Sequence, residues 1–214
     1  MTRRTLMTVL GLLAVGLAAT PRARQAPADP KPGEWTHYGH DLGNTRYAPL
    51  DRLSRETLSS VRIAWRWKSD NFSAPPVFRN ESTPLMVDGT LYFTTGTERW
   101  VVAADAGTGQ TKWTWHLDEG ERGRHAPRRD SGRGVAYWTD GTNARILVVT
   151  PGFQLVALDA TTGLPVPTFG DHGVVDLKAN LGVEIDLETA AIGSSSPPLV
   201  FENTVVIGPA LEVG

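Results

Sequence analysis

A turn that occurs twice constrains the fold of this chain more than any other feature of its sequence. The segment AADAGTGQTKW begins at Ala103, and ALDATTGLPVP begins at Ala157, so that Asp159 follows Asp105 by 54 residues. Both copies follow an apolar run and share the pattern A-x-D-x-x-T-G. The aspartate can accept hydrogen bonds from the next backbone N–H groups, and the glycine can take the positive φ that ends such a turn. This spacing indicates a repeated structural unit.

The residues around the first turn predict a four-stranded antiparallel unit. Two apolar strands, 84–87 and 91–94, are separated by Asp88-Gly89, a pair typical of tight hairpins. A third strand, from Trp100 to Ala104, leads into the turn, and a fourth follows at 112–116. Strands joined in this order form a meander in which each strand pairs with the next.

Two further units follow the first. The second spans 134–169 and contains apolar strands at 135–137, 146–150 and 155–158. The third begins at Ser195 and repeats the first at an offset of 114 residues, because Pro198, Val205 and Ile207 match Pro84, Leu91 and Phe93. Repeated four-stranded units predict an all-β fold, a β-propeller, whose blades bury their faces against one another. Three units do not close a ring, so we expect the first two to three blades of a longer protein.

The segments before the first blade are less regular. Residues 34–50 mix aromatic side chains with Gly, Asn and Asp, and we expect an irregular segment held by Trp35, Tyr38 and Tyr47. Ser54 can cap a short helix that runs through Leu58. The sequence IAWRWK, residues 63–68, alternates as a strand does.

The N-terminus has the layout of an export signal. Arg3 and Arg4 precede an apolar run at 6–19 that is too short for a comfortable membrane span. We therefore expect a signal peptide and cleavage region at 1–26, a linker at 27–33, the propeller part at 34–214 and a periplasmic location, reached by the Sec or the twin-arginine route. The chain has no cysteine, which excludes disulfides, thiol chemistry and a cysteine-linked lipid; its net charge of −2 does not suggest a nucleic-acid partner.

The repeated turn resembles the tryptophan-docking motif of the quinoprotein alcohol and glucose dehydrogenases, which are eight-bladed propellers that carry pyrroloquinoline quinone (PQQ). Trp113 ends the first copy and is expected to dock on the next blade, whereas Pro167 stands in place of the tryptophan in the second copy, where that contact should be lost or replaced. The segments 35–41 and 46–50 resemble the opening of this family. FGDHGVVDL, residues 169–177, is similar to an inter-blade stretch of its glucose-dehydrogenase-like branch.

The resemblance implies four positions of a cofactor site. Glu81 stands before Ser-Thr-Pro-Leu, where the family has a glutamate that hydrogen-bonds the quinone. Arg133 begins R-G-x-x-Y-W, where the family's arginine contacts the quinone oxygens. Ser195 lies where the family has a PQQ-binding threonine, and Glu212 falls near its calcium-ligating glutamate, although one residue closer to Gly208 than usual. Without this resemblance, each would be read as a solvated charge or a turn residue.

The segment 122–133 is rich in arginine. Such a cluster is most often a solvated loop, but some of its guanidiniums could neutralise the three carboxylates of PQQ, and Arg128 or Arg129 could cover one face of the quinone ring. The alcohol-oxidising branch of the family has adjacent cysteines here, where this chain has Pro127 and Arg128. The glucose-dehydrogenase-like branch also lacks the cysteines, so the resemblance is closer to that branch.

The resemblance implies a PQQ- and calcium-dependent dehydrogenase that oxidises an alcohol or aldose and passes electrons to ubiquinone or cytochrome c. The family's catalytic aspartate would lie beyond Gly214, so this stretch alone is expected to be inactive. Two alternatives remain at this point: a non-catalytic propeller that serves as a scaffold or binding module in the cell envelope, and a sugar-binding propeller without redox activity. The histidines lack zinc-ligand spacing, and the glycine-rich segments open no helix that could bind a dinucleotide.

Overall fold

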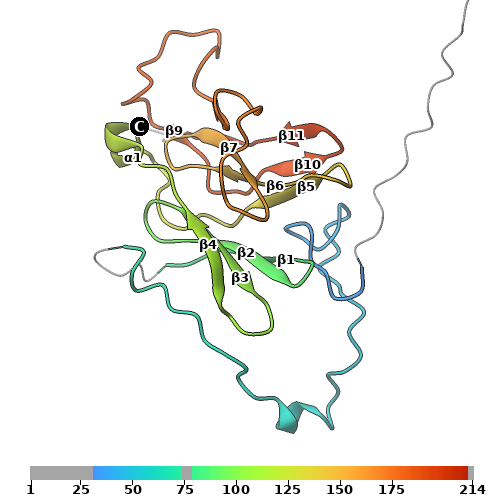
Figure 1. Ribbon diagram of the computed structural model, residues 1–214. Coiled ribbons are helices and arrows are strands. Elements are labelled where there is room, and N and C mark those ends of the chain that lie inside the picture. Colours follow the sequence, from blue (N-terminus) through green and yellow to red (C-terminus); the bar gives the residue numbers. More distant parts are fainter. Residues whose placement is uncertain (1–30, 74–78, 212–214) are drawn as a thin grey trace, which may run out of the picture.

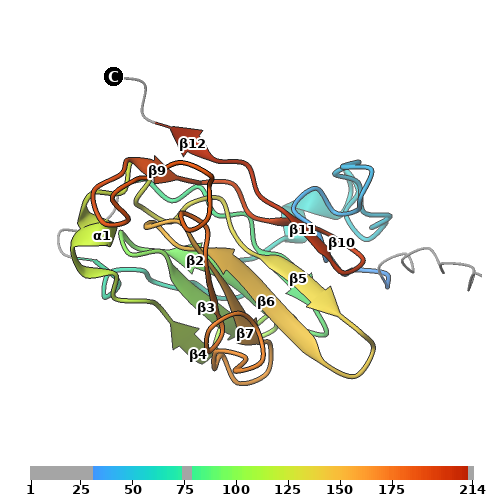
Figure 2. The same cartoon turned by 90° about the horizontal axis from the view of Figure 1, so that it is seen from above.

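Two four-stranded antiparallel sheets form the centre of the molecule. The computed structural model describes residues 31–73 and 79–211, and Figures 1 and 2 show the two sheets packed against each other. The first sheet consists, in order, of β1 (Leu85–Val87), β2 (Thr90–Thr95), β3 (Trp100–Asp105) and β4 (Thr111–Trp115). The second consists of β5 (Ala136–Thr139), β6 (Ala144–Val149), β7 (Gln154–Asp159) and β8 (Val174–Asp176). Both are meanders, which confirms the predicted four-stranded units.

A third unit begins with the hairpin of β10 (Leu199–Phe201) and β11 (Thr204–Val206). Leu199 pairs with Val206, and Leu85 pairs with Tyr92, so the offset of 114 residues holds in the strand register as well as in the sequence. A separate two-stranded ladder joins β9 (Ile192–Gly193) to β12 (Ala210–Leu211). The arrangement confirms an all-β fold of propeller blades, of which two are complete in the described residues.

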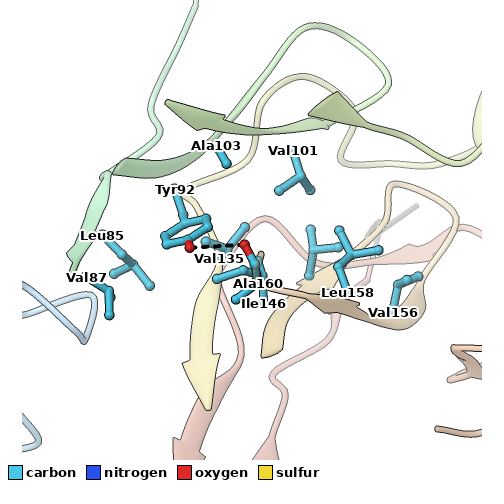
Figure 3. Packing of buried hydrophobic residues seen from close by; sticks show 11 residues of the cluster. Leu85, Val87, Tyr92, Val101, Ala103, Val135, Ile146, Val156, Leu158 and Ala160 are labelled. Atoms are coloured by element: carbon cyan, nitrogen blue, oxygen red, sulfur yellow. Dashed lines mark hydrogen bonds between the residues drawn. The ribbon is translucent and has the colours of Figure 1, made fainter. Parts of the chain in front are cut away.

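The core lies between the sheets. Its first cluster includes Leu85 and Val101 from the first sheet and Ile146 and Leu158 from the second, all with no exposed surface (Figure 3). A second cluster, with Leu147, Val149 and Leu155 among its members, packs the other face of the second sheet against the β10–β11 hairpin. Each sheet therefore buries apolar surface against the next one along the chain, as stacked blades must.

The repeated turn has the same geometry in both copies. Asp105 Oδ1 accepts the N–H groups of Gly107 and Thr108 at 3.0 and 2.9 Å, and Asp159 Oδ1 accepts those of Thr161 and Thr162 at 3.0 and 2.8 Å. The glycines that end the two turns have the same φ of +73°. These bonds favour the charged carboxylate and lower the pKa of Asp105, with the Thr108 hydroxyl as the main cause.

A tryptophan from an earlier part of the chain docks on each turn. Trp113 donates its indole N–H to Ala160 O at 3.0 Å, and a Cβ at Gly163 would lie only 2.5 Å from its ring. The predicted docking of Trp113 on the next blade is thus confirmed. Trp65 does the same for the first turn, since it donates to Ala106 O at 3.0 Å. This role of Trp65 was not predicted from the sequence.

Four local expectations were wrong. Tyr47 does not hold the segment 34–50, because its side chain is 67% exposed. Residues 63–68 belong to no strand ladder among the described residues; Trp65 and Trp67 attach them instead through indole N–H bonds to Ala106 O and Thr111 Oγ1. The helix expected from Ser54 through Leu58 is a short 3-10 helix, η1 (Leu58–Ser60), that begins after a Ser54–Thr57 turn. The stretch 169–177 does not lie between blades, since it contributes β8 to the second sheet.

The chain contains little helix. Besides η1, the described residues form one helix, α1 (Gly120–Arg124), which lies in the arginine-rich segment. No helix within the described ranges has the length and apolar character needed to cross a membrane. The proposed signal peptide and most of the linker lie outside the described residues.

Candidate cofactor site

Three loops that lead into successive units meet at one end of the sheets. Glu81 precedes β1, Arg133 precedes β5 and Ser195 precedes β10, so the three residues occupy equivalent places. The Thr83 N–H donates to Arg133 O at 3.0 Å, and the Arg133 N–H donates to Ser195 O at 2.8 Å. These two backbone bonds join all three units at the start of their first strands.

The glycine after Arg133 allows the loops before β1 and β5 to lie this close together. Gly134 has a φ of +128°, and a Cβ there would lie 2.8 Å from Thr83 O. Only glycine combines that backbone conformation with the missing side chain. The R-G pair is therefore a structural requirement of the junction as well as part of a motif.

The predicted cofactor residues line one cavity of about 480 Å³. Glu81, Arg128, Arg129, Arg133 and Ser195 all contribute to its wall. Six further residues, which were not predicted from the sequence, also line the cavity: Arg79, Pro127, Asp130, Ser131, Gly132 and Ala210. The structure thus brings together all five predicted cofactor-binding residues. The predicted metal ligand, Glu212, lies outside the described residues.

The cavity wall carries excess positive charge. Four of its residues are arginines, and two, Glu81 and Asp130, are acids. Glu81 lies between two guanidiniums, with Oε2 3.8 Å from Arg133 Nε and Oε1 3.9 Å from Arg79 Nε, and its side chain is 49% exposed. Ion pairs this long and this exposed hold their partners weakly. The guanidiniums therefore remain able to bind another anion.

The other arginines of the 122–133 segment have different partners. Arg122 forms a bidentate pair with Asp176 at 2.6 and 2.8 Å and also donates to Gly152 O. The hydrogen bonds from Arg122 lower the pKa of Asp176. Arg124 pairs with Glu121 at 2.6 Å on the surface. Of the arginines in this segment, Arg128, Arg129 and Arg133 line the cavity, whereas Arg122 and Arg124 do not, so part of the arginine cluster is structural or solvated.

A buried arginine lies behind the cavity wall. Arg99 stands in the β2–β3 hairpin and is 3% exposed, and its guanidinium donates to five carbonyl oxygens of neighbouring loops. Burial lowers its pKa to about 10, which leaves it charged at neutral pH. A charged residue at a hairpin tip is ordinarily solvent-exposed, so the sequence held no signal for this placement.

The cavity suits a polyanionic ligand with polar edges. Planar guanidiniums bind carboxylates through paired hydrogen bonds, and Ser195 adds a hydroxyl. A larger hollow of about 680 Å³, between residues 31–42 and the β5–β6 hairpin, contains none of the predicted site residues. Among the residues that the structure describes, no group of three His, Cys, Asp or Glu side chains could hold a metal ion. The PQQ prediction therefore fits the described wall, whereas the calcium prediction depends on Glu212.

Comparison with known proteins assigns the architecture. The profile of the glucose/ethanol/alcohol dehydrogenase β-propeller domain, a PQQ family, matches residues 35–213. The glycerol dehydrogenase large subunit of Gluconobacter thailandicus is 29% identical over 195 residues, which are 86% of this chain and 26% of that protein. The quinoprotein glucose dehydrogenase of Escherichia coli K12 is 28% identical over 204 residues, 88% of this chain and 24% of that protein.

A solved structure agrees with these sequence relatives. The quinohemoprotein alcohol dehydrogenase ADHIIG of Pseudomonas putida HK5 superposes with a TM-score of 0.61 at 28% identity, over 84% of this chain and 23% of that one. The chain thus spans about a quarter of the length of the relatives it matches. Because the family profile covers nearly all of the described residues, the chain belongs to the family of PQQ-dependent glucose, ethanol and alcohol dehydrogenase β-propellers.

Proposed function

We propose that this chain supplies part of the PQQ-binding site of a dehydrogenase that oxidises an alcohol or sugar hydroxyl. One observation carries the proposal: Glu81, Arg128, Arg129, Arg133 and Ser195 line a single cavity where three successive units begin. A structural junction alone would not require four arginines around one cavity. A ligand with several carboxylates accounts for them.

The residues of the wall have separate tasks in this proposal. Arg128, Arg129 and Arg133 bind carboxylate or quinone oxygens, and the Ser195 hydroxyl donates a further hydrogen bond. Glu81 lies between Arg79 and Arg133, with which it forms only weak ion pairs, and accepts a hydrogen bond from the cofactor. When bound, PQQ supplies the two-electron acceptor for the oxidation; the protein supplies binding, orientation and electrostatics.

The finer parts of the proposal rest on the family and on the sequence. Calcium, a hard ion that prefers oxygen ligands, would bind near Glu212. Electrons would pass to ubiquinone or cytochrome c. The basic and apolar N-terminus favours export to the periplasm. Pro127 and Arg128, in place of adjacent cysteines, favour the glucose-dehydrogenase-like branch and hence aldoses among the substrates to be tested.

The proposal is tested with the full-length protein. PQQ is titrated into the apoprotein in the presence of CaCl₂, and dye reduction is followed with a panel of alcohols and aldoses. Arg133→Gln and Glu81→Gln should each weaken PQQ binding about tenfold or more, because each removes a charge-assisted contact. Arg124→Gln is the matched control, since Arg124 lies in the same segment but pairs with Glu121.

The result separates this proposal from the scaffold alternative. A scaffold needs the docking turns but no cofactor, so failure of the wild-type protein to bind PQQ would reject the enzyme function. PQQ binding without dye reduction by any substrate would favour a binding propeller without redox activity. Unchanged affinity in both variants would reject the assigned residues while leaving the cofactor in place.

A further inference from the structure

The Arg99 guanidinium is saturated by backbone carbonyl groups. Its Nη1 donates to Val149 O at 2.8 Å and to Ser194 O at 2.6 Å. Its Nη2 donates to Arg128 O at 2.8 Å and to Arg129 O at 3.4 Å, and its Nε donates to Asp130 O at 3.4 Å. A guanidinium has five N–H donors, so these five bonds use all of them. No other side-chain type could donate all five of these hydrogen bonds.

The five acceptors belong to three separate segments. Val149 ends β6, residues 128–130 form the loop before β5, and Ser194 follows β9. Arg99 itself comes from the first sheet, immediately before β3. A single side chain therefore ties the first unit to the second and to the start of the third. The loop 128–130 and Ser195, next to Ser194, both contribute to the cavity wall.

The bonds to Arg99 also fix which way the wall's peptide groups face. In a trans peptide unit the N–H points opposite to the C=O. Because the carbonyls of Arg128, Asp130 and Ser194 point toward Arg99, the N–H groups of the following residues point away from it. Those residues are Arg129, Ser131 and Ser195, and all three line the cavity. Within the described residues, none of their N–H groups has an acceptor.

The buried charge adds to the effect of the hydrogen bonds. Among the described residues, no carboxylate lies within ion-pair distance of Arg99, so its direct partners are all carbonyl oxygens, while Glu119 and Asp130 favour its charge from further away. A Cβ on Gly132 would lie 2.7 Å from Arg99 Nε, which shows how closely the loop packs on the guanidinium. A lysine at this position would keep the charge but could offer only three donors from one point.

We infer that Arg99 is a positioning residue of the cofactor site: its five carbonyl bonds hold the loop 128–131 and residues 194–195 in the arrangement that presents their side chains and free N–H groups to an anionic ligand. The inference rests on the proposed function for the identity of that ligand, PQQ. Arg99 itself lies behind the wall and acts through the loops that it holds.

The first experiment needs no cofactor. Hydrogen exchange of peptides covering 127–133 and 193–196 is measured in the full-length apoprotein, for wild type, Arg99→Lys and Arg99→Met. Both variants should exchange faster in these two segments, with the rest of the protein unchanged. Arg145→Met is the matched control, because Arg145 lies in β6 over the Trp138 ring and outside the cavity. Exchange in Arg99→Lys that equals wild type would overturn the inference.

The second experiment measures PQQ itself. The dissociation constant should rise about tenfold or more in Arg99→Lys and Arg99→Met, and the absorption spectrum of bound PQQ should shift, because the wall no longer has a fixed geometry. A purely electrostatic role would be rescued by lysine, and a purely structural one would lower the unfolding temperature without changing the affinity. Either result would contradict the positioning role.

A milder variant covers the case in which the Arg99 variants do not fold. Gly132→Ala retains Arg99 but places a Cβ against it. This variant should also show faster hydrogen exchange and weaker PQQ binding, each to a smaller extent than the Arg99 variants. Gly141→Ala controls for backbone strain, since Gly141 also has a positive φ, +92°, but open space around it. If Gly132→Ala and Gly141→Ala had the same exchange rates in these segments and the same dissociation constant for PQQ, the inference would be rejected. If wild type binds no PQQ, the proposed function fails, and the exchange data still decide whether Arg99 holds the wall.

Discussion

At the residue scale, glycines with the same backbone conformation differ in what a side chain at their position would contact. Gly89, Gly109 and Gly163 all have a φ of +73°. A Cβ at Gly89 would meet nothing within 4 Å, whereas at Gly109 and Gly163 it would lie 2.6 and 2.5 Å from the rings of Trp65 and Trp113. The first glycine is needed for its backbone alone. The other two are also needed for the docked ring.

This difference predicts unequal costs for the same substitution. Gly89→Ala should cost about 1 to 2 kcal/mol, the strain of a left-handed non-glycine residue. Gly163→Ala should cost at least about 1 kcal/mol more, because the methyl group displaces Trp113 from Ala160 O as well. Urea unfolding followed by tryptophan fluorescence measures both changes. Equal destabilisation by the two variants would show that docking of the Trp113 ring does not require a glycine at position 163.

Only some of the residues that form or support the site could be predicted from the sequence. Glu81, Arg133 and Ser195 could be selected because each stands at a fixed distance before an apolar strand. Arg99 could not, because its burial results from loops 29 to 95 residues away in the sequence closing over a hairpin tip. Trp65 was missed for a related reason, since its docking partner lies 41 residues further along the chain.

At the element scale, the hairpins were predictable and the outer edges were not. A hairpin such as β1–β2 depends on a local turn and alternating side chains, so the offset of 114 residues was enough to find β10–β11. The strand β8 pairs with β7 only after a 14-residue excursion between Asp159 and Val174. Residues 63–68 alternate like a strand, but a pattern cannot state whether a partner strand is present.

One ion pair joins two of these less predictable elements. Arg122 on α1 holds Asp176 on β8 through two short hydrogen bonds, and Asp176 Oδ1 also accepts the Lys178 N–H. These bonds hold the pKa of Asp176 below its usual value, although partial burial opposes the shift. A carboxyl group with a lowered pKa stabilises the fold above its unfolded pKa, and that stabilisation is lost as the pH falls through the folded value.

The pair therefore predicts a specific acid sensitivity. Between about pH 5 and pH 2, wild type should lose more stability than Asp176→Asn, whose side chain does not titrate. Asp88→Asn is the control, because the Lys31–Asp88 pair is solvent-exposed and should contribute little. Urea midpoints across the pH range measure the difference. Parallel pH profiles for wild type and Asp176→Asn would exclude the pair as a source of the acid sensitivity.

At the scale of the whole molecule, stacking determines where the site can form. Each unit buries one face against the next, and this brings the loops before β1, β5 and β10 to the same end of the sheets. The fold class followed from the repeat, but the shared cavity did not, because its wall combines residues more than 100 positions apart in sequence, from Arg79 to Ser195. Only stacking of the units brings such residues together.

The charge of the cavity contrasts with that of the whole chain. The formal net charge is −2, whereas the cavity wall has four arginines against two acids. Attraction of a polyanion should therefore be local and should weaken as salt shortens the screening length from about 10 Å at 0.1 M to about 3 Å at 1 M. The dissociation constant for PQQ should rise at least about threefold over this range, because a partly exposed wall is well screened.

Substitution of the arginines should reduce this salt dependence. Arg129→Gln removes one charge from the wall and should flatten the plot of log Kd against log salt, whereas Arg124→Gln, which leaves the cavity unchanged, should keep the wild-type slope. PQQ titrations at several NaCl concentrations compare the three proteins. A slope that is the same for all three would mean that the arginines of the wall do not attract the ligand through charge, and the site would then depend on hydrogen-bond geometry alone.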